Sequence, residues 1–322
     1  MLHMAGAEVT GFALPPADPS LFAIAGLEKR MNSVCGDIRN FDALWTAFSA
    51  AQPEIVLHLA AQPIVRESYR DPVGTYSTNI MGTVHILECV RQCDSVRSFL
   101  NVTTDKVYEN HEWPWGYRET DRLNGFDPYA NSKSCSELVT DSYRKSFFST
   151  RTVALSTARA GNVIGGGDFS ADRIIPDCIR AVQAGKPIQL RNPYSVRPYQ
   201  HVLEPLFAYL LIAQKQYEDK RFAGNYNVGP EGCDCLSTGK LADLFCQAWG
   251  GKARWEYIGS DGPHEDTTLK LDCSKINMVL GWHPRWHAGL AVEETVAWTR
   301  AWMDGENMPD VMERQIKAFA QI

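Results

Sequence analysis

The sequence lacks the features that mark membrane-spanning, secreted and nucleic-acid-binding proteins. None of its apolar runs approaches the ~18 residues of a membrane span. Residues 1–7 have neither the basic start nor the long apolar run of a signal peptide. The formal net charge of −6 argues against a nucleic-acid partner, which normally requires a basic face. We therefore expect a cytoplasmic protein with no membrane or nucleic-acid partner.

Paired cysteine patterns are also missing. The nine cysteines are odd in number, scattered, and include no CxxC pair. This distribution favours reduced thiols in a cytoplasmic protein over a disulfide framework. His283 and His287 have the spacing of one helical turn, but Pro284 lies between them and no thiol is near in the sequence. We expect no metal site.

Alternating strand and helix signals fill the first half of the chain. Apolar runs of strand length occur at residues 55–60 and 98–103, and helical patterns occur at 41–51 and after Pro72 and Pro128. The run at 55–60 predicts a parallel strand covered on both faces. This repetition predicts a doubly wound parallel α/β sheet with right-handed crossovers.

The helix after Pro72 has apolar residues at a spacing of three or four. We expect one buried stripe, formed by Val73, Tyr76, Ile80, Val84 and Leu87.

The pattern changes beyond residue 164, where a glycine-rich loop at 165–168 and several prolines divide the chain into shorter pieces. With 322 residues against ~100–200 for a usual domain, two lobes are expected. We assign residues 1–164 to a nucleotide-binding lobe, with 198–228 returning to it. Residues 165–197 and 229–322 form the smaller second lobe.

A glycine-rich phosphate loop is absent from the place where this fold normally carries it. Dinucleotide-binding sheets begin with a strand, a glycine-rich turn and a helix that receives the pyrophosphate. No such pattern precedes Glu8, and the triple glycine at 165–167 lacks the context of a P-loop. Either the fold does not bind a dinucleotide, or its first unit is missing. Residues 6–11 resemble the end of a first helix and the start of a second strand, so we expect a truncated start.

Two segments carry candidate catalytic chemistry. Tyr129 and Lys133 are four residues apart at the start of a predicted helix and therefore share a face. The lysine charge should lower the pKa of the tyrosine, which can then take a hydroxyl proton while a hydride leaves the same carbon. The pattern alone also fits a surface tyrosine beside a solvated lysine. A strand that ends in threonine about 25 residues earlier favours the catalytic reading.

These motifs together resemble a known family. HLAAQ at 58–62, NIMGT at 79–83, TDK at 104–106, YANSK at 129–133 and RAGNV at 159–163 are similar to the extended short-chain dehydrogenase/reductases, in their epimerase/dehydratase branch. The similarity runs through essentially the whole chain, including 197–202 and 263–265. It implies an NAD-binding lobe, a C-terminal nucleotide-sugar lobe and the 4,6-dehydration of CDP-glucose.

The resemblance also implies catalytic roles. Tyr129 would accept the proton of the sugar 4-hydroxyl as hydride passes from C4 to NAD. Thr104 would hydrogen-bond the 4-oxygen, and Asp105 would protonate the departing C6 hydroxyl before hydride returns to C6. Lys106 stands where related dTDP-glucose dehydratases carry glutamate, and either removes the C5 proton or orients Asp105.

The remaining expected contacts concern the two ligands. For the cofactor, the resemblance implies Asp37, Ile38, Ala60, Ala61, Gln62, Asn79 and Thr103, together with Tyr129 and Lys133. For the sugar nucleotide, positive charge must meet the pyrophosphate, and the candidates are Arg197 and Arg173. Asn162 is a candidate donor to a phosphate or sugar oxygen, and His201 and His264 are further candidate substrate contacts. A structural role remains an alternative for Asn79 and for both histidines.

Two other functions stay open. A nucleotide-sugar 4-epimerase shares the tyrosine and lysine but does not need an acid at O6. An inactive or binding-only fragment is the alternative of another class, because no phosphate loop is visible. The family also implies a homodimer, formed by the helices at 72–93 and 128–147.

Overall fold

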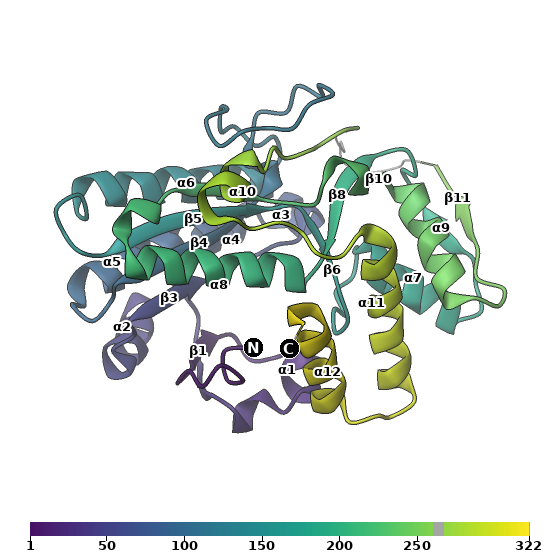
Figure 1. Ribbon diagram of the computed structural model, residues 1–322, viewed down its shortest axis with the longest axis horizontal. Coiled ribbons are helices and arrows are strands. Elements are labelled where there is room, and N and C mark those ends of the chain that lie inside the picture. The colour runs from purple at the N-terminus through teal and green to yellow at the C-terminus, as the bar shows by residue number, and fades with distance from the viewer. Residues whose placement is uncertain (260–266, 322) are drawn as a thin grey trace.

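A parallel β-sheet with helices on both faces forms the larger lobe of the protein. The computed structural model describes residues 1–259 and 267–321. The sheet has the order β3–β4–β5–β9 and all of its ladders are parallel. Its strands are β3 (Ile55–His58), β4 (Ser98–Thr104), β5 (Ala154–Ala160) and β9 (Asn225–Val228). The predicted doubly wound α/β class is confirmed (Figure 1).

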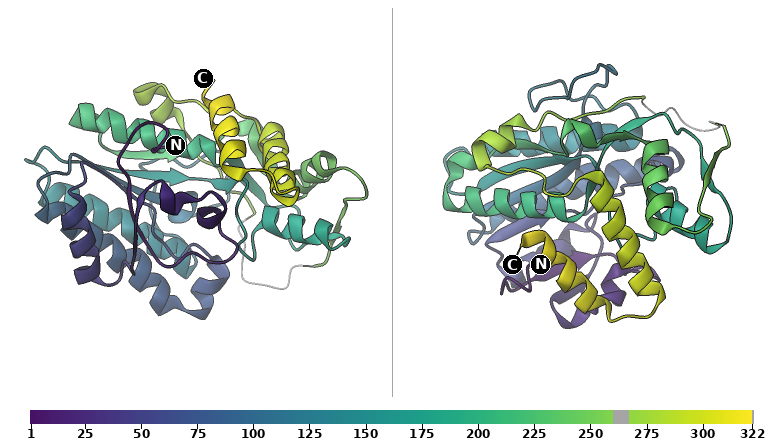
Figure 2. Two further views of the ribbon diagram at one scale, coloured as in Figure 1. Left: turned by 90° about the horizontal axis from the view of Figure 1, so that it is seen from below. Right: turned by 45° about the vertical axis from the view of Figure 1, so that its right-hand side comes forward.

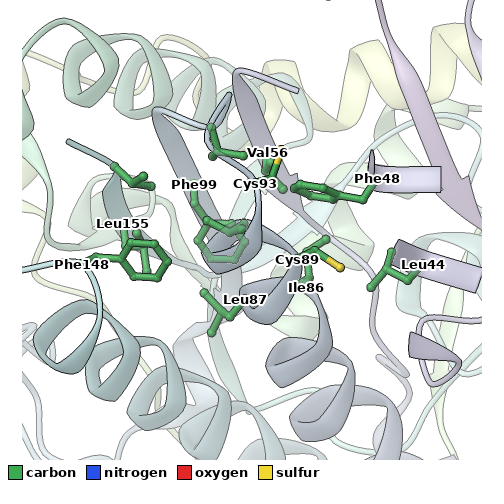
Figure 3. Close-up of a cluster of buried hydrophobic side chains, with 13 residues drawn as sticks. Leu44, Phe48, Val56, Ile86, Leu87, Cys89, Cys93, Phe99, Phe148 and Leu155 are labelled. Atoms are coloured by element: carbon green, nitrogen blue, oxygen red, sulfur yellow. The ribbon is translucent and has the colours of Figure 1, made fainter. Parts of the chain in front are cut away.

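Apolar side chains on both faces of the sheet explain the continuous apolar strands. Successive residues of a strand point to opposite faces, so Phe99 joins the core beneath α2 and α5, whereas the adjacent Leu100 joins the core beneath α8. Figure 3 shows the first of these cores. The covering helices are α2 (Phe41–Ala51), α5 (Gly82–Gln92) and α6 (Pro128–Ser146) on one face, and α8 (Leu203–Glu218) and α10 (Ser274–Leu280) on the other.

The sheet of the larger lobe is in two parts. The strands β1 (Thr10–Ala13) and β2 (Asn32–Cys35) form a separate parallel pair. Among residues 1–259 and 267–321, no strand joins β1 to β3, and no glycine-rich turn connects a strand to a helix ahead of β3. The two parts of the sheet are therefore not hydrogen-bonded to each other through a described strand. Val56 of β3 packs in the core beneath α2 and α5, and Leu57 packs against the core beneath α8, so this parallel strand is covered on both faces as expected. Ile55, at the start of this edge strand, is 44% exposed.

The predicted helix after Pro72 is interrupted by a π-helical turn. It consists of α4 (Pro72–Tyr76), the turn η2 (Ser77–Met81) and then α5. A π turn inserts one extra residue, so the buried face is rotated relative to the predicted stripe. Thr75, Asn79 and Thr83 are buried, whereas Val73 is 78% exposed. The stripe prediction was therefore wrong at its start, although Leu87 is buried as expected.

Beside the larger sheet lies a group of short strands packed against helices, to which residues of both predicted lobes contribute (Figure 2). The strand β8 (Val196–His201) is parallel to β6 (Asn162–Ile164) and antiparallel to β10 (Cys235–Ser237). The core between these strands and the helices that cover them includes Ile164, Tyr199, Phe245 and Val292. The other elements are β7 (Ile188–Leu190), β11 (Trp255–Tyr257), α7 (Ile174–Gln183), α9 (Thr238–Trp249), α11 (Ala288–Met303) and α12 (Met308–Ala320).

Short elements complete the described chain. They are α1 (Leu21–Ile24), α3 (Val65–Arg70) and the 3-10 turns η1 (Leu27–Lys29), η3 (Asp105–Val107), η4 (Lys220–Phe222) and η5 (Gly232–Asp234). Leu21 and Ile24 of α1 pack against Trp298 and Met308 of α11 and α12. None of the described helices is long and apolar enough to span a membrane.

Candidate active site

Thr104 and Asp105 lie at the carboxyl end of β4, where open parallel sheets bind their ligands. The chain turns sharply there into η3. The Thr104 hydroxyl donates to Asp105 Oδ1 at 3.0 Å, and the Lys106 backbone N–H donates to Thr104 Oγ1 at 3.4 Å. The turn therefore fixes both candidate residues relative to the end of the strand.

The carboxyl group of Asp105 is buried, and only one of its two oxygens is hydrogen-bonded within the described residues. The residue is 2% exposed, and Oδ2 has no hydrogen-bond partner among the described residues. Burial raises the pKa of Asp105, although Lys106, Thr104 and Arg197 act in the opposite direction. A carboxyl group whose pKa is raised holds its proton more readily and can serve as an acid.

Tyr129 lies in the first turn of α6. The helix begins with Pro128, and the Asp127 carboxylate caps it by accepting a hydrogen bond from the Ala130 N–H at 2.8 Å. This arrangement places the Tyr129 side chain close enough to Thr104 and Asp105 for both residues to act on its pKa. The candidate tyrosine, threonine and aspartate are thus brought together from two elements.

The pKa of Tyr129 differs from the sequence-based expectation. Burial raises the pKa of Tyr129 to about 12, although the Thr104 side chain and the Arg173 charge act in the opposite direction. Lys133 is itself 4% exposed and donates from Nζ to the Val102 carbonyl at 3.0 Å, and burial lowers its pKa to about 8. The predicted lowering of the tyrosine pKa was wrong, because the desolvation of the phenolate outweighs nearby positive charge.

The segment after β3 carries Ala60, Ala61 and Gln62, and Asn79 holds it in place. Asn79 Oδ1 accepts from the Gln62 N–H at 2.8 Å, and its Nδ2 donates to the Gln62 carbonyl at 3.1 Å. The same Nδ2 donates to Ser132 Oγ at 2.9 Å. Asn79 is 1% exposed, and it ties the end of β3 to α6. These contacts favour its structural alternative.

Asp37 and Ile38 follow β2, on the separate two-stranded part of the sheet. The Asp37 carboxylate forms an ion pair with Arg39 at 2.6 Å, and the Arg39 side chain holds the pKa of Asp37 below its usual value. The Ile38 carbonyl lies 2.9 Å from His85 Nδ1. The structure therefore places this pair after β2, whereas the other expected cofactor residues follow β3 or belong to η2, β4 or α6.

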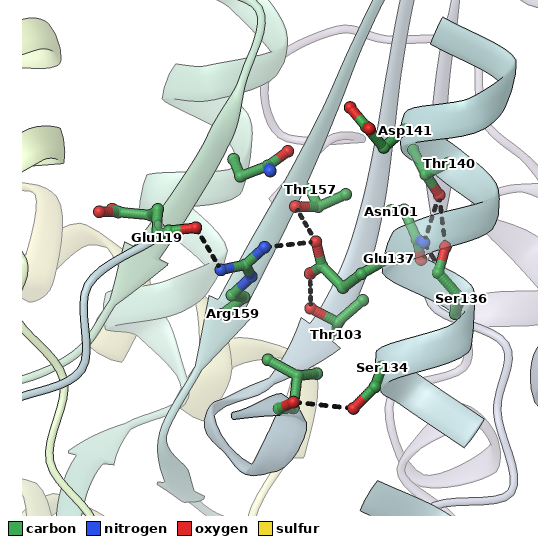
Figure 4. Close-up of polar contacts among 12 residues, drawn as sticks. Asn101, Thr103, Glu119, Ser134, Ser136, Glu137, Thr140, Asp141, Thr157 and Arg159 are labelled. Atoms are coloured by element: carbon green, nitrogen blue, oxygen red, sulfur yellow. Dashed lines mark hydrogen bonds and ion pairs between the residues drawn. The ribbon is translucent and has the colours of Figure 1, made fainter. Parts of the chain in front are cut away.

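A buried polar network below Thr103 was missed by the sequence reasoning (Figure 4). Glu137 of α6 accepts hydrogen bonds from Thr103 at 2.5 Å and Thr157 at 2.7 Å. It also pairs with Arg159 of β5 at 2.9 Å, and both charged side chains are 1% exposed. The network ties α6 to β4 and β5. A charged residue inside an otherwise uncharged strand was the signal that could have indicated it.

Both candidate arginines lie near the site but come from different elements. Arg197 of β8 is 7% exposed, donates to the Val196 carbonyl at 2.9 Å, and lowers the pKa of Asp105 by its charge. Arg173 directly precedes α7, donates to the Pro63 carbonyl at 3.0 Å, and lowers the pKa of Tyr129. The second lobe thus brings positive charge to both candidate catalytic groups.

The remaining candidates differ in their placement. His201 is fully buried, accepts from the Leu203 N–H at 3.3 Å and packs against Trp286 with ring centres 4.9 Å apart. Burial lowers the pKa of His201 to about 4, and its environment favours the structural alternative. Asn162 is partly buried in β6. His264 lies outside the described residues.

Comparisons with known proteins agree on one group of sugar-nucleotide enzymes. A family profile described as GDP-mannose 4,6 dehydratase matches residues 20–295. The chain is 48% identical over 321 residues to a CDP-glucose 4,6-dehydratase of Salmonella typhimurium, covering 98% of this chain and 89% of the relative. It is 27% identical to a dTDP-glucose 4,6-dehydratase of Xanthomonas campestris, covering 89% of this chain and 85% of that one.

Solved structures show the same fold at lower identity. A UDP-glucose 4-epimerase from Thermotoga maritima, crystallised with UDP-glucose, superposes with a TM-score of 0.81 at 21% identity, covering 94% of both chains. A dTDP-glucose 4,6-dehydratase from Streptomyces venezuelae, crystallised with NAD, gives a TM-score of 0.79 at 22% identity, covering 95% and 93%. Because the identities are low, these structures support the fold alone.

Proposed function

Because the chain belongs to the GDP-mannose 4,6-dehydratase family, we propose that it is an NAD-dependent lyase that converts CDP-glucose to CDP-4-keto-6-deoxyglucose and water. The observation that carries this proposal is the group formed by Thr104, Asp105 and Tyr129. An epimerase needs the tyrosine but has no use for a buried acid beside it. The relative that is 48% identical bears the name CDP-glucose 4,6-dehydratase, which supports cytidine as the base.

The chain's own residues would move protons at three positions of the sugar. Tyr129, which lies beside Thr104, would take the proton of the 4-hydroxyl. The 4-ketone then acidifies C5–H, and Lys106 would remove that proton or orient Asp105. Asp105, whose raised pKa keeps a proton available, would give it to the departing C6 hydroxyl. When bound, NAD supplies the acceptor for the C4 hydride and returns that hydride to C6.

The described residues fit the cofactor in part. Ala60 and Ala61 follow β3 and Asp37 follows β2, at the strand ends where open α/β sheets bind nucleotides. We infer that these residues, with Ile38, Gln62, Asn79, Thr103, Tyr129 and Lys133, would contact NAD. No glycine-rich turn that could receive the pyrophosphate occurs in the part of the chain that the structure describes. Retention of NAD is therefore the first property to measure.

The sugar nucleotide would lie between the two lobes. We assign residues 1–164 and 198–228 to the NAD-binding lobe, because α8 packs on β4 and β5 and β9 pairs with β5. Residues 165–197 and 229–322 would form the nucleotide-sugar lobe. Arg197 and Arg173 would neutralise the pyrophosphate, and Asn162, His201 and His264 complete the proposed contacts.

We also infer a cytoplasmic homodimer. All nine cysteines are free thiols, which fits a reducing compartment. The helices α4, α5 and α6 pack side by side, and they would meet the same helices of a second copy.

Product analysis tests the proposed reaction. The purified chain, supplied with NAD and CDP-glucose, should form a 4-keto product that absorbs in alkali. The variant Tyr129→Phe should lose this activity. Tyr76→Phe should keep it, because the Tyr76 hydroxyl contacts Asn131 at 3.3 Å and not Thr104. Formation of CDP-galactose without a keto product would instead support the epimerase. A folded chain that binds the sugar nucleotide without turnover would support a binding-only protein.

A further inference from the structure

Three side chains of types that bind transition metals meet outside the candidate active site. Cys233 and Asp234 both lie in η5, which directly precedes β10. His287 directly precedes α11. One potential ligand atom from each of the three lies within 4.8 Å of the other two. The sequence analysis expected no metal site, because no thiol is near His287 along the chain. The fold brings Cys233 to it from 54 residues away.

The carboxylate of Asp234 is the centre of this cluster. Asp234 is 7% exposed, and its Oδ2 lies 2.8 Å from His287 Nδ1. Cys233 Sγ lies 3.8 Å from the same Oδ2. Tetrahedral zinc, with Zn–S near 2.3 Å and Zn–N or Zn–O near 2.0 Å, separates its ligand atoms by roughly 3.3–3.6 Å. Shifts of about an ångström in two exposed side chains would therefore reach that geometry.

Capping of α11 explains part of the cluster but not all of it. Asp234 Oδ1 accepts from the Ala288 N–H at 2.9 Å, and Oδ2 pairs with His287. These contacts account for the carboxylate and the imidazole as a helix cap. The Cys233 thiol has no capping role. The Glu231 carboxylate, which lies 4.0 Å from the Cys233 sulfur, has none either.

From this placement we propose that Cys233, Asp234 and His287 bind one zinc(II) ion, with Glu231 within reach as a fourth ligand. A thiolate, an imidazole and a carboxylate suit zinc, whereas magnesium and calcium prefer oxygen ligands alone. On binding, the Cys233 thiol releases its proton to solvent. The proton that His287 Nδ1 shares with Asp234 also passes to solvent, and the lone pair left on that nitrogen binds the ion. The ion would link η5 to α11 beside β10, whose Leu236 pairs with Arg197 of β8.

Cobalt(II) is the probe for this site, because it replaces zinc and is coloured. The reduced, metal-free chain titrated with cobalt(II) should develop thiolate charge-transfer and visible bands that saturate at one ion per chain. Added zinc(II) should abolish the bands. The variants Cys233→Ser and His287→Gln should lose them, and circular dichroism should show that these exposed substitutions leave the fold intact.

Two matched variants serve as controls. Cys235→Ser removes the thiol two residues further on, and His283→Gln removes the histidine four residues before His287. Both should keep the bands and the one-to-one stoichiometry. In the wild type and these controls, zinc should also raise the midpoint of thermal unfolding, because it binds only the folded chain. The proposal is overturned if no bands develop, if they survive Cys233→Ser, or if Cys235→Ser abolishes them equally.

Discussion

At the residue scale, Asp105 is the side chain that would separate dehydration from epimerisation in the proposed mechanism. Its carboxyl group is buried and has an unpartnered oxygen, so an amide can replace it without a change of shape. In Asp105→Asn we expect oxidation at C4 to continue and elimination at C5 and C6 to fail. Reduced cofactor should then accumulate, and its near-ultraviolet absorbance measures it. The control is Glu109→Gln, which breaks an ion pair with Arg122. This variant should turn over CDP-glucose at the wild-type rate.

The same substitution should stabilise the fold near neutral pH. Burial raises the pKa of Asp105 above its usual 3.8. At neutral pH the carboxyl group of the unfolded chain is ionised, whereas ionising the same group in the folded protein costs free energy. That penalty is present at neutral pH and vanishes below the unfolded pKa. The melting temperature of Asp105→Asn should therefore exceed that of the wild type at neutral pH, and the two should converge in acid. A lower melting temperature for the variant at neutral pH would contradict this assignment.

His58 makes stability depend on pH in the acid range. The ring is 3% exposed and lies 3.1 Å from Thr83 Oγ1. Burial, with a contribution from the Lys133 charge, lowers the pKa of His58 from 6.5 to about 3. Below 6.5 the unfolded chain binds a proton that the folded protein does not, so the free energy of unfolding falls as the pH falls.

The expected size of this effect follows from the proton linkage. Between about pH 7 and pH 5, His58 should remove about 2 kcal/mol from the free energy of unfolding. In His58→Gln, urea unfolding should show a pH slope that is flatter by this amount. The exposed control His283→Gln should retain the wild-type slope. An unchanged slope in His58→Gln would show that the imidazole is not held neutral in the fold.

At the scale of elements, the Glu137–Arg159 pair joins α6 to the sheet. Replacing Glu137 by glutamine leaves the guanidinium buried and without a counter-charge. We expect Glu137→Gln to lower the free energy of unfolding by about 3–5 kcal/mol, because a buried charge without its partner is costly. Urea denaturation measures this loss.

A double variant distinguishes the charge from the packing. Glu137→Leu with Arg159→Met replaces both partners by apolar groups, and should recover much of the stability lost in Glu137→Gln. If the double variant is as unstable as the single one, the loss comes from packing or from the Thr103 and Thr157 hydrogen bonds.

Local patterns predicted the elements of the site better than its electrostatics. Tyr129 and Lys133 could be placed on one helical face because the spacing of a helix is a property of adjacent residues. The pKa of Tyr129 could not be predicted, since it depends on burial by segments distant in the sequence. The π-helical turn at 77–81 has no sequence signature that we could identify, and it changed which side of the helix is buried.

At the scale of the whole molecule, the alternation of apolar strands and helices was sufficient to predict a doubly wound sheet. Because the sequence shows no glycine-rich loop before residue 8, a gap in the sheet could also be expected, and β1 and β3 lie in separate sheets. The meeting of Cys233 with His287 could not be predicted, because it depends on how η5 and α11 pack in the second lobe.

The outer surface of the helical layer tests the proposed homodimer. Val73 of α4 is 78% exposed and Leu138 of α6 is 56% exposed, and these helices pack side by side. In a two-fold symmetric dimer the same surface occurs on both copies, so one substitution places a like charge on each side of the interface.

We therefore expect Leu138→Glu to convert a dimer to a monomer in sedimentation velocity experiments, at protein concentrations where the wild type stays dimeric. The control is Met278→Glu on α10, which removes an even more exposed apolar side chain, 86% exposed, from the opposite face of the sheet. It should remain dimeric, because α10 lies outside the proposed interface. A monomeric wild type would contradict the proposed homodimer. A dimer that survives Leu138→Glu but not Met278→Glu would show that the two copies associate through another surface.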